Sequence, residues 1–346
     1  MAKRRKKNNS IIPFVIFLMI IGICFWTLSK DENSQKFYKK VEEKIANKVE
    51  IKLKIIDEDS NTRPLAVMIN NHPKAVANHA GLQDAYLVYE IIVEGGYTRM
   101  MAIFKDKETE KIGSVRSSRH YFLDYAMEND AIYVHFGWSP KAQSDISKYS
   151  INNINGLYDD AFWRDTSLNV AYEHTAFTSI EKINKIIAKR GYRNTTSEKP
   201  LLKYSINNID ISNIEGAISA NNVVLPYSYV HTTSYQYDPN SKVYKRYINN
   251  TAHVDAITKQ QYTTKNIIIQ KVSNYSMDSY GRQDLNNIGT GSGYYITNGY
   301  AVPINWSKNS KNEKTVYKYL DGEEIKVNDG NTYIQIQPLS QNTTIS

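Results

Sequence analysis

The sequence contains a single cysteine among its 346 residues, so it cannot form an internal disulfide or a cysteine-based zinc site. Glycine is also scarce, with 16 residues, and the Gly-x-Ser-x-Gly motif of serine hydrolases does not occur. Hydrophobic residues make up 41% of the chain and charged residues 23%, which excludes a disordered tail. A chain of this length is expected to form about two domains, each able to bury a core.

The N-terminus combines a basic segment with an apolar one. Residues 3–7 are all lysine or arginine, and residues 11–28 form an uncharged, mostly apolar run that is just long enough to cross a bilayer. Because cationic flanks stay on the cytoplasmic side, residues 1–29 predict a cytoplasmic tail and a single-pass transmembrane anchor in the cell membrane. The remaining chain would then be extracytoplasmic.

Two other interpretations of this segment remain open. A cleaved signal peptide would end in small residues, but the apolar run ends Phe-Trp-Thr-Leu. A lipoprotein would use Cys24, but Ile23 stands where lipidation requires a small residue.

The net charge of the exported part is small. The five basic residues of the N-terminal tail account for five of the eight net positive charges of the chain, so the exported part carries +3. That charge is too small to indicate a nucleic acid partner.

Residues 30–58 are rich in charge and predict a helical stalk. Within them, apolar residues fall four apart and form one narrow stripe of a helix: Phe37, Val41, Ile45, Val49 and Leu53. At 1.5 Å per residue, such a stalk would be roughly 40 Å long. The stripe either packs against the protein's own folded part or supports self-association in the membrane.

The rest of the chain predicts an α+β protein, with an N-terminal α/β domain at 59–200 and a β-rich C-terminal domain at 215–346. In the first domain, apolar runs predict strands at 64–69, 85–93, 100–104 and 131–136. Helices are expected after Ser117, after Ser139-Pro140, and after a capping box at 178–181 that opens a helix ending at Gly191. In the second domain, strands are expected at 222–230, 242–248, 265–272, 293–297, 300–305, 315–320 and 332–337. Residues 289–293, with three glycines, predict a flexible turn.

Glu94 is the first candidate for chemistry. It follows the strand predicted at 85–93 and precedes Gly95-Gly96, which let backbone or ligand approach closely. A carboxylate at the carboxyl end of a strand lies where α/β proteins usually place their sites. Pairing with Arg99 on the next strand would explain the same carboxylate without any function. Glu90, four residues away along a strand, lies too far from Glu94 to form a glycosidase pair.

A second candidate is the segment that leads into the predicted helix after residue 116. Arg116, Ser117 and Arg119 combine two guanidinium groups with a hydroxyl at a helix N-terminus, which suits an anion or a carboxylate. A purely structural interpretation is that Ser117 caps the helix while the arginines pair with local acids.

Histidines complete the candidate set. His135 ends a predicted strand, and His174 precedes a capped helix, so both are expected near the same rim as Glu94. A metal site would need His72, His79, His135 and His174, but their spacing matches no metal signature. We therefore expect no metal and no cofactor.

Several motifs together resemble the YerB-like family of bacterial envelope proteins. They are the run Arg-Pro-Leu-Ala-Val-Met-Ile-Asn-Asn at 63–71, Val-Glu-Gly-Gly-Tyr-Thr-Arg at 93–99, Ile-Gly-Ser-Val-Arg-Ser-Ser-Arg at 112–119, His-Val-Asp at 253–255 and Gly-Ser-Gly at 291–293. The resemblance covers roughly residues 60–340 and implies export and a pairing of two domains. It also implies that the positions matching the family's pattern are site candidates: Glu94, Arg99, Arg116, Arg119 and His135.

Three functions are compatible with these residues. The first is cleavage of peptidoglycan glycan strands in a lytic-transglycosylase-like reaction, with Glu94 as acid and then base, His135 assisting it, and Arg99, Arg116, Ser117, Arg119 and His174 binding substrate. This function requires burial to raise the pKa of Glu94. The second is a non-catalytic wall-binding or scaffolding module that uses the same arginines and the tyrosine-rich C-terminal half. The third is an enzyme that acts on a phosphate-bearing polymer and binds it through Arg116 and Arg119.

Overall fold

The computed structural model describes residue 36 and residues 52–346. The predicted anchor at 11–28 and most of the predicted stalk lie outside the described residues. Within the described part, no helix is both long and apolar enough to span a bilayer. At the end of the predicted stripe, Leu53 packs against the core, and the backbone N–H groups of Lys54 and Ile55 donate to the carboxylate of Asp329 at 3.0 Å.

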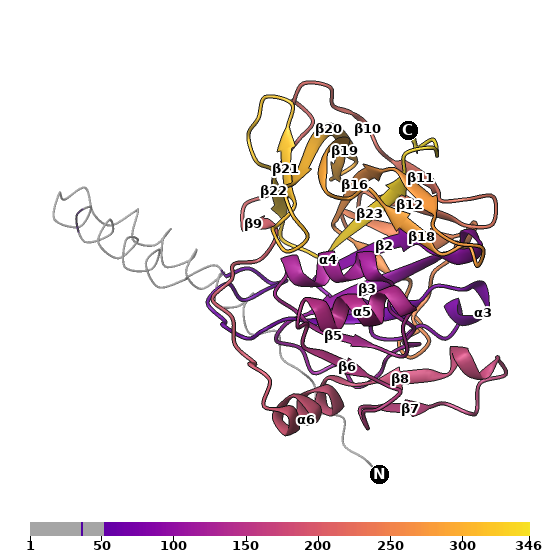
Figure 1. Cartoon of the computed structure of the whole chain (residues 1–346). Coiled ribbons are helices and arrows are strands. Elements are labelled where there is room, and N and C mark those ends of the chain that lie inside the picture. The colour runs from indigo at the N-terminus through magenta and orange to yellow at the C-terminus, as the bar shows by residue number, and fades with distance from the viewer. Residues whose placement is uncertain (1–35, 37–51) are drawn as a thin grey trace, which may run out of the picture. The chain divides into compact units, whose positions relative to one another are not determined.

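The largest sheet of the described chain has eleven strands and draws them from both halves of the sequence (Figure 1). Its order is β10 (Ile218–Ser219), β20 (Tyr300–Lys308), β19 (Gly289–Thr297), β16 (Asn266–Val272), β23 (Thr332–Pro338), β2 (Leu87–Ile92), β3 (Thr98–Phe104), β1 (Leu65–Asn70), β5 (Ile132–His135) and β6 (Asn153–Asn155), with β21 (Val316–Tyr319) paired to β20.

The two halves meet where β2 pairs with β23. These strands run parallel, from Leu87 opposite Thr332 to Ile91 opposite Ile336, and β23 also pairs in parallel with β16. In Figure 1 the indigo and magenta strands therefore continue directly into the orange and yellow ones. The boundary expected between residues 200 and 215 separates stretches of chain that share one sheet.

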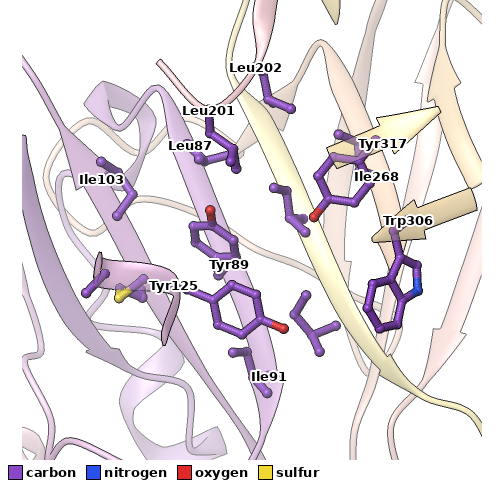
Figure 2. Close-up of a cluster of buried hydrophobic side chains, with 14 of the residues drawn as sticks. Leu87, Tyr89, Ile91, Ile103, Tyr125, Leu201, Leu202, Ile268, Trp306 and Tyr317 are labelled. Atoms are coloured by element: carbon purple, nitrogen blue, oxygen red, sulfur yellow. The ribbon is translucent and has the colours of Figure 1, made fainter. Parts of the chain in front are cut away.

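One face of this sheet is covered by α4 (His120–Glu128) and α5 (Pro140–Lys148). Side chains from β2, β3, β16 and β23 form a core there with α4 and with β20 and β21 from the other end of the sheet (Figure 2). The aromatic members that Figure 2 labels are Tyr89, Tyr125, Trp306 and Tyr317. Every residue of β1, β2, β3 and β23 is buried, as expected for strands covered on both faces.

The opposite face is covered by α6 (Ile180–Arg190) and by a second, six-stranded sheet. The second sheet has the order β14 (Thr251–Ala252), β13 (Val243–Ile248), β12 (Thr232–Asp238), β11 (Asn222–Pro226) and β24 (Thr344–Ile345), with β15 (Thr263–Thr264) paired to β13. The predicted α+β class and the mostly β C-terminal half are confirmed.

Smaller elements connect these layers. The remaining strands are β4 (Ile112–Gly113), β8 (Ala176–Thr178) and β7 (Phe162–Arg164) in one sheet, β17 (Asn274–Ser276) with β18 (Gln283–Leu285), and β22 (Lys326–Asn328) with β9 (Lys203–Ser205). Within residues 52–346, the remaining helices are α3 (Pro73–Val76) and the 3-10 turns η1 (Leu82–Asp84), η2 (Glu94–Gly96) and η3 (Tyr172–His174).

The helix ends predicted from the sequence are partly confirmed. Ser139 caps α5, with Pro140 at its first position, and Gly191 ends α6 in the left-handed conformation. The cap of α6 is Ser179 rather than the predicted Thr178, because Thr178 belongs to β8 and donates its hydroxyl to Ala161. Residues 289–293 are not a turn but the first half of β19.

Candidate functional site

Glu94 sits in the turn of the β2–β3 hairpin. The strand ends at Ile92, and the N–H of Val93 donates to the carbonyl of Tyr97 across the turn. Gly95 and Gly96 both have positive φ, 69° and 75°, a conformation that L side chains rarely adopt. The paired glycines therefore turn the chain sharply and place the Glu94 side chain beyond the end of the sheet.

The segment leading into α4 is held by the ends of β1 and β5. The N–H of Arg116 donates to Met68 in β1, the carbonyl of Arg116 accepts from Phe136 after β5, and Ser118 donates to Gly137. Arg119 is the N-cap residue of α4. These main-chain bonds bring the guanidinium groups of two non-adjacent arginines to the same edge of the sheet as Glu94.

Glu94 and three predicted arginines line one pocket of about 370 Å³. This volume lies near the lower end of the range for small-molecule sites. The lining residues come from both halves of the chain and are Asn70, His72, Val93, Glu94, Tyr97, Thr98, Arg99, Arg116, Arg119, Tyr280 and Arg282. The last two lie between β17 and β18 of the C-terminal half.

Inside the pocket, Glu94 is bound by Arg119 in a bidentate ion pair. Nε of Arg119 donates to Oε1 of Glu94 at 2.5 Å, and Nη2 donates to Oε2 at 3.0 Å. Nη2 of Arg99 lies 3.9 Å from Oε2, while Nη1 of Arg99 donates to the carbonyl of Ser117 at 2.6 Å. The alternative that Glu94 pairs mainly with Arg99 is therefore corrected, because its main partner is Arg119.

The charges in the pocket set its protonation states. Burial by itself would raise the pKa of Glu94, but the hydrogen bond and charge of Arg119 and the charge of Arg99 outweigh it, so the pKa is lowered. Burial, followed by the charge of Arg119, lowers the pKa of Arg99 to about 9. The carboxylate is thus ionised at neutral pH, and Arg99 carries a positive charge that is only partly neutralised.

Two stacked histidines lie beside the pocket, but the predicted substrate-binding residue His174 is buried and does not line it. The rings of His72 and His174 lie 4.9 Å apart and nearly parallel, and His72 lines the pocket. Nδ1 of His72 accepts from the N–H of Lys74, and Nδ1 of His174 accepts from the Asn70 side chain at 2.8 Å. Burial lowers the pKa of both rings, so each neutral ring carries its proton on Nε2.

Two other predicted residues lie elsewhere. His135 is fully buried, with Nδ1 donating to the carbonyl of Gly137 at 2.8 Å and Nε2 3.1 Å from Oδ1 of Asn153. Its ring packs between Tyr133 and Trp138 and does not line the pocket, because its two nitrogens are engaged by Gly137 and by Asn153 of β6. Ser117 contributes its carbonyl to Arg99 and does not cap α4. The expectation that His135 faces the same rim as Glu94 is therefore wrong.

Behind the pocket floor lies a buried ion pair between the two halves. Glu90 of β2 and Arg246 of β13 are both fully buried, with Nη2 of Arg246 2.7 Å from Oε2 of Glu90. Oε1 accepts further bonds at 2.8–3.0 Å from Asn71, Thr98, Thr233 and His231. Burial would raise the pKa of Glu90, but the charge of Arg246 and the bond to His231 outweigh it and lower the pKa strongly.

A directed chain of hydrogen bonds runs from this ion pair to the pocket. Arg246 can only donate, so Nδ1 of His253 accepts from it, and Nε2–H of His253 donates to Nδ1 of His79 at 2.8 Å. Nε2–H of His79 then donates to the carbonyl of Asn70 at 2.5 Å. The side chain of Asn70 lines the pocket and binds His174, so this residue connects the interior to the site.

Sequence reasoning missed part of the lining. Asn70 lies within the motif at 63–71, and Tyr97 and Thr98 lie within the motif at 93–99, so the resemblance could have suggested all three. Tyr280 and Arg282 come from a hairpin of the other half, and no local pattern links them to the site. Within residues 52–346, no three His, Cys, Asp or Glu side chains are grouped so that they could hold a metal ion.

Comparison with known proteins identifies the family. Two family models match, both described as a protein of unknown function (DUF3048): its N-terminal domain matches residues 53–193, and its C-terminal domain matches residues 223–334. The chain belongs to the DUF3048 family. The DUF3048 pocket described above draws its walls from both matched regions, because Glu94 lies in the first and Tyr280 in the second.

Relatives of this DUF3048 protein support the YerB-like resemblance. YerB of Bacillus subtilis (strain 168), whose curated name describes it as a candidate lipoprotein, is 31% identical over 291 residues, which is 83% of this chain and 84% of YerB. The crystal structure of the YerB protein from Bacillus subtilis matches with a TM-score of 0.74 at 30% identity, covering 85% of this chain and 99% of that one. The expected membership of the YerB-like family is confirmed.

Proposed function

We propose that this protein is an envelope-located, non-catalytic module that binds carboxylate groups of peptidoglycan in the pocket around Arg99. One observation carries the proposal: apart from Glu94, every charged side chain lining the pocket within the described residues is a guanidinium, and the neutral ring of His72 adds an N–H donor. Guanidinium groups bind carboxylates with two parallel hydrogen bonds, as Arg119 does here with Glu94.

Cleavage of glycan strands receives less support from the same pocket. A lytic-transglycosylase-like reaction needs an acid that is protonated at neutral pH, whereas Arg119 lowers the pKa of Glu94. His135 would not assist, because it does not line the pocket. A wall-binding function requires neither a proton donor nor a second carboxylate.

An envelope location is supported by the relative's description as a candidate lipoprotein. In this chain, residues 11–28 would attach the protein to the membrane as a single-pass helix, with the N-terminus cytoplasmic and the folded part facing the wall. Self-association through residues 30–58 would bring several pockets to one strand of wall polymer.

The test is a pull-down of the full-length, detergent-solubilised chain with purified sacculi. Wild type is expected to sediment with sacculi, and both Arg99→Gln and the less buried Arg116→Gln are expected to lose at least about tenfold in affinity, because each removes a charge-assisted donor. Arg193→Gln is the matched control, since Arg193 pairs with Asp130 and does not line the pocket. Its sedimentation should equal that of wild type.

Mass spectrometry of the supernatant separates binding from catalysis. We expect no anhydro-muropeptides from wild type or from Glu94→Gln. Release of these products by wild type but not by Glu94→Gln would establish cleavage and overturn the proposal. Equal sedimentation of wild type, Arg99→Gln and Arg116→Gln, each shown to be folded by its melting curve, would exclude the pocket as the binding site.

A further inference from the structure

Glu94 occupies an unusual position for a residue in an anion-binding pocket. Its carboxylate is bound to Nε and Nη2 of Arg119, which would otherwise be available to bind a ligand carboxylate with two parallel hydrogen bonds. The turn that carries Glu94 is itself fixed, because the Ser228 hydroxyl donates to the carbonyl of Gly96 at 2.6 Å. A ligand anion must therefore bind beside a fixed negative charge.

The pocket's fixed charges can be counted from its ion pairs. Four guanidinium groups line it, and three of them have carboxylate partners: Glu94 for Arg119, Glu173 for Arg116 at 3.5 Å, and Asp278 for Arg282 at 2.8 Å. Arg99 is the fourth, and its nearest carboxylate oxygen, 3.9 Å away, already accepts from Arg119. The described pocket thus has one uncompensated positive charge, on a side chain that is more than nine-tenths buried.

We infer that Glu94 sets the charge selectivity of the pocket, so that it accepts a saccharide bearing one carboxylate and rejects a dianionic phosphate monoester. One negative charge neutralises Arg99, whereas a second would face Glu94 across a partly buried space with weak screening. This inference rests on the proposed function, since it names the ligand class of the same pocket.

The aromatic lining fits a sugar ring next to the carboxylate. Tyr97 and Tyr280 both line the pocket, and the ring of Tyr280 lies 4.8 Å from the guanidinium of Arg282 while remaining 77% exposed. The C–H face of a pyranose ring packs on such aromatic surfaces. Tyr97 also contacts His72, with ring centroids 4.7 Å apart, which holds its ring in place.

The test compares two small probes by calorimetric titration of the full-length chain in detergent at pH 7.5. N-acetylmuramic acid carries one carboxylate, and N-acetylglucosamine 6-phosphate is mostly a dianion at this pH, because the second pKa of a phosphate monoester is about 6. Wild type should prefer the carboxylate by at least about tenfold. Glu94→Gln should raise the affinity for the phosphate at least about tenfold and remove or reverse this preference.

Two further variants test whether the effect comes from the charge of Glu94, rather than from the shape of its side chain or from any nearby negative charge. Glu94→Asp keeps the charge, so it should keep the preference for the carboxylate. Glu173→Gln removes one negative charge from the rim, where the side chain is 56% exposed, and screening should limit its effect to less than about threefold.

The possible failures are distinguishable. If both probes bind wild type and Glu94→Gln, shown to be folded by its melting curve, has an unchanged ratio of affinities, the role of Glu94 is overturned while the pocket remains a binding site. The same holds if Glu173→Gln changes the ratio as much as Glu94→Gln. If neither probe binds wild type, both this inference and the proposed function of the pocket are overturned.

Discussion

Replacing Arg246 with methionine tests whether the buried ion pair holds the two halves together. The change would leave Glu90 fully buried without its cationic partner, although its other hydrogen-bond donors remain. Breaking such a pair by removing one partner costs about 3–5 kcal/mol. The same change removes the donor to Nδ1 of His253, and leaving a buried acceptor without its partner costs about 1–3 kcal/mol more.

The assay is urea unfolding of the full-length chain at pH 7.5, followed by tryptophan fluorescence. Arg246→Met should lower the free energy of unfolding by about 4 kcal/mol or more. The double variant Glu90→Gln/Arg246→Met should recover part of this loss, because no unpaired charge remains buried. Lys185→Met is the control: its partner Glu181 and Lys185 itself are about 70% exposed, so the loss should stay below about 0.5 kcal/mol. A loss below about 1 kcal/mol for Arg246→Met, or a double variant as unstable as the two single losses added together, would refute the reasoning.

Two further predictions concern the interior and the turn. Burial lowers the pKa of His79 to about 4 from an ordinary 6.5, so the unfolded chain binds more protons between these values and stability should fall by up to about 3 kcal/mol as pH drops through this window. His79→Gln should flatten that part of a stability–pH curve and leave the slope from pH 7 to 9 unchanged; an unaltered slope below pH 6.5 would contradict the pKa. Gly96→Ala should lower the melting temperature more than Gly191→Ala, because both have positive φ but an added Cβ at 96 would lie 2.7 Å from the Ser228 hydroxyl, whereas at 191 it would meet nothing within 4 Å. An equal decrease in melting temperature for the two alanine variants would show that the Ser228 side chain moves away from the added Cβ without cost.

Local signals in the sequence predicted much of the framework. Apolar runs identified β1, β2, β3 and β5, because strands buried on both faces read as continuous hydrophobic segments. The expected position of Glu94 at a strand end followed from the same run and from the two glycines after it. Arg116 and Arg119 were predicted near it from their place before a helix, and Arg99 from its place on the next strand and from the family resemblance. The structure brings all four side chains to one pocket.

What the sequence did not reveal depends on contacts between distant residues. Gly293 was expected where a flexible turn at 289–293 meets a strand at 293–297, yet it lies in the middle of β19. An added Cβ there would fall 1.8 Å from the carbonyl oxygen of Ile269 in the adjacent strand. A glycine at this position allows the two strands to approach closely. Local sequence patterns cannot distinguish this role from the flexibility that glycine gives to a turn. In the same way, Glu90 resembled a second acid near Glu94, and its partner Arg246 is 156 residues away.

The buried network gives the pocket a dependence on both halves of the fold. Thr98 lines the pocket and donates its hydroxyl to Glu90, while Asn70 lines it and accepts from His79 through its carbonyl. Both bonds lead to Arg246 of the C-terminal half, so the pocket floor is fixed only when β13 packs behind β2. A binding site assembled in this way cannot be divided at the boundary between the two family regions, because neither region alone supplies both the arginines and the ion pair that holds their floor in place.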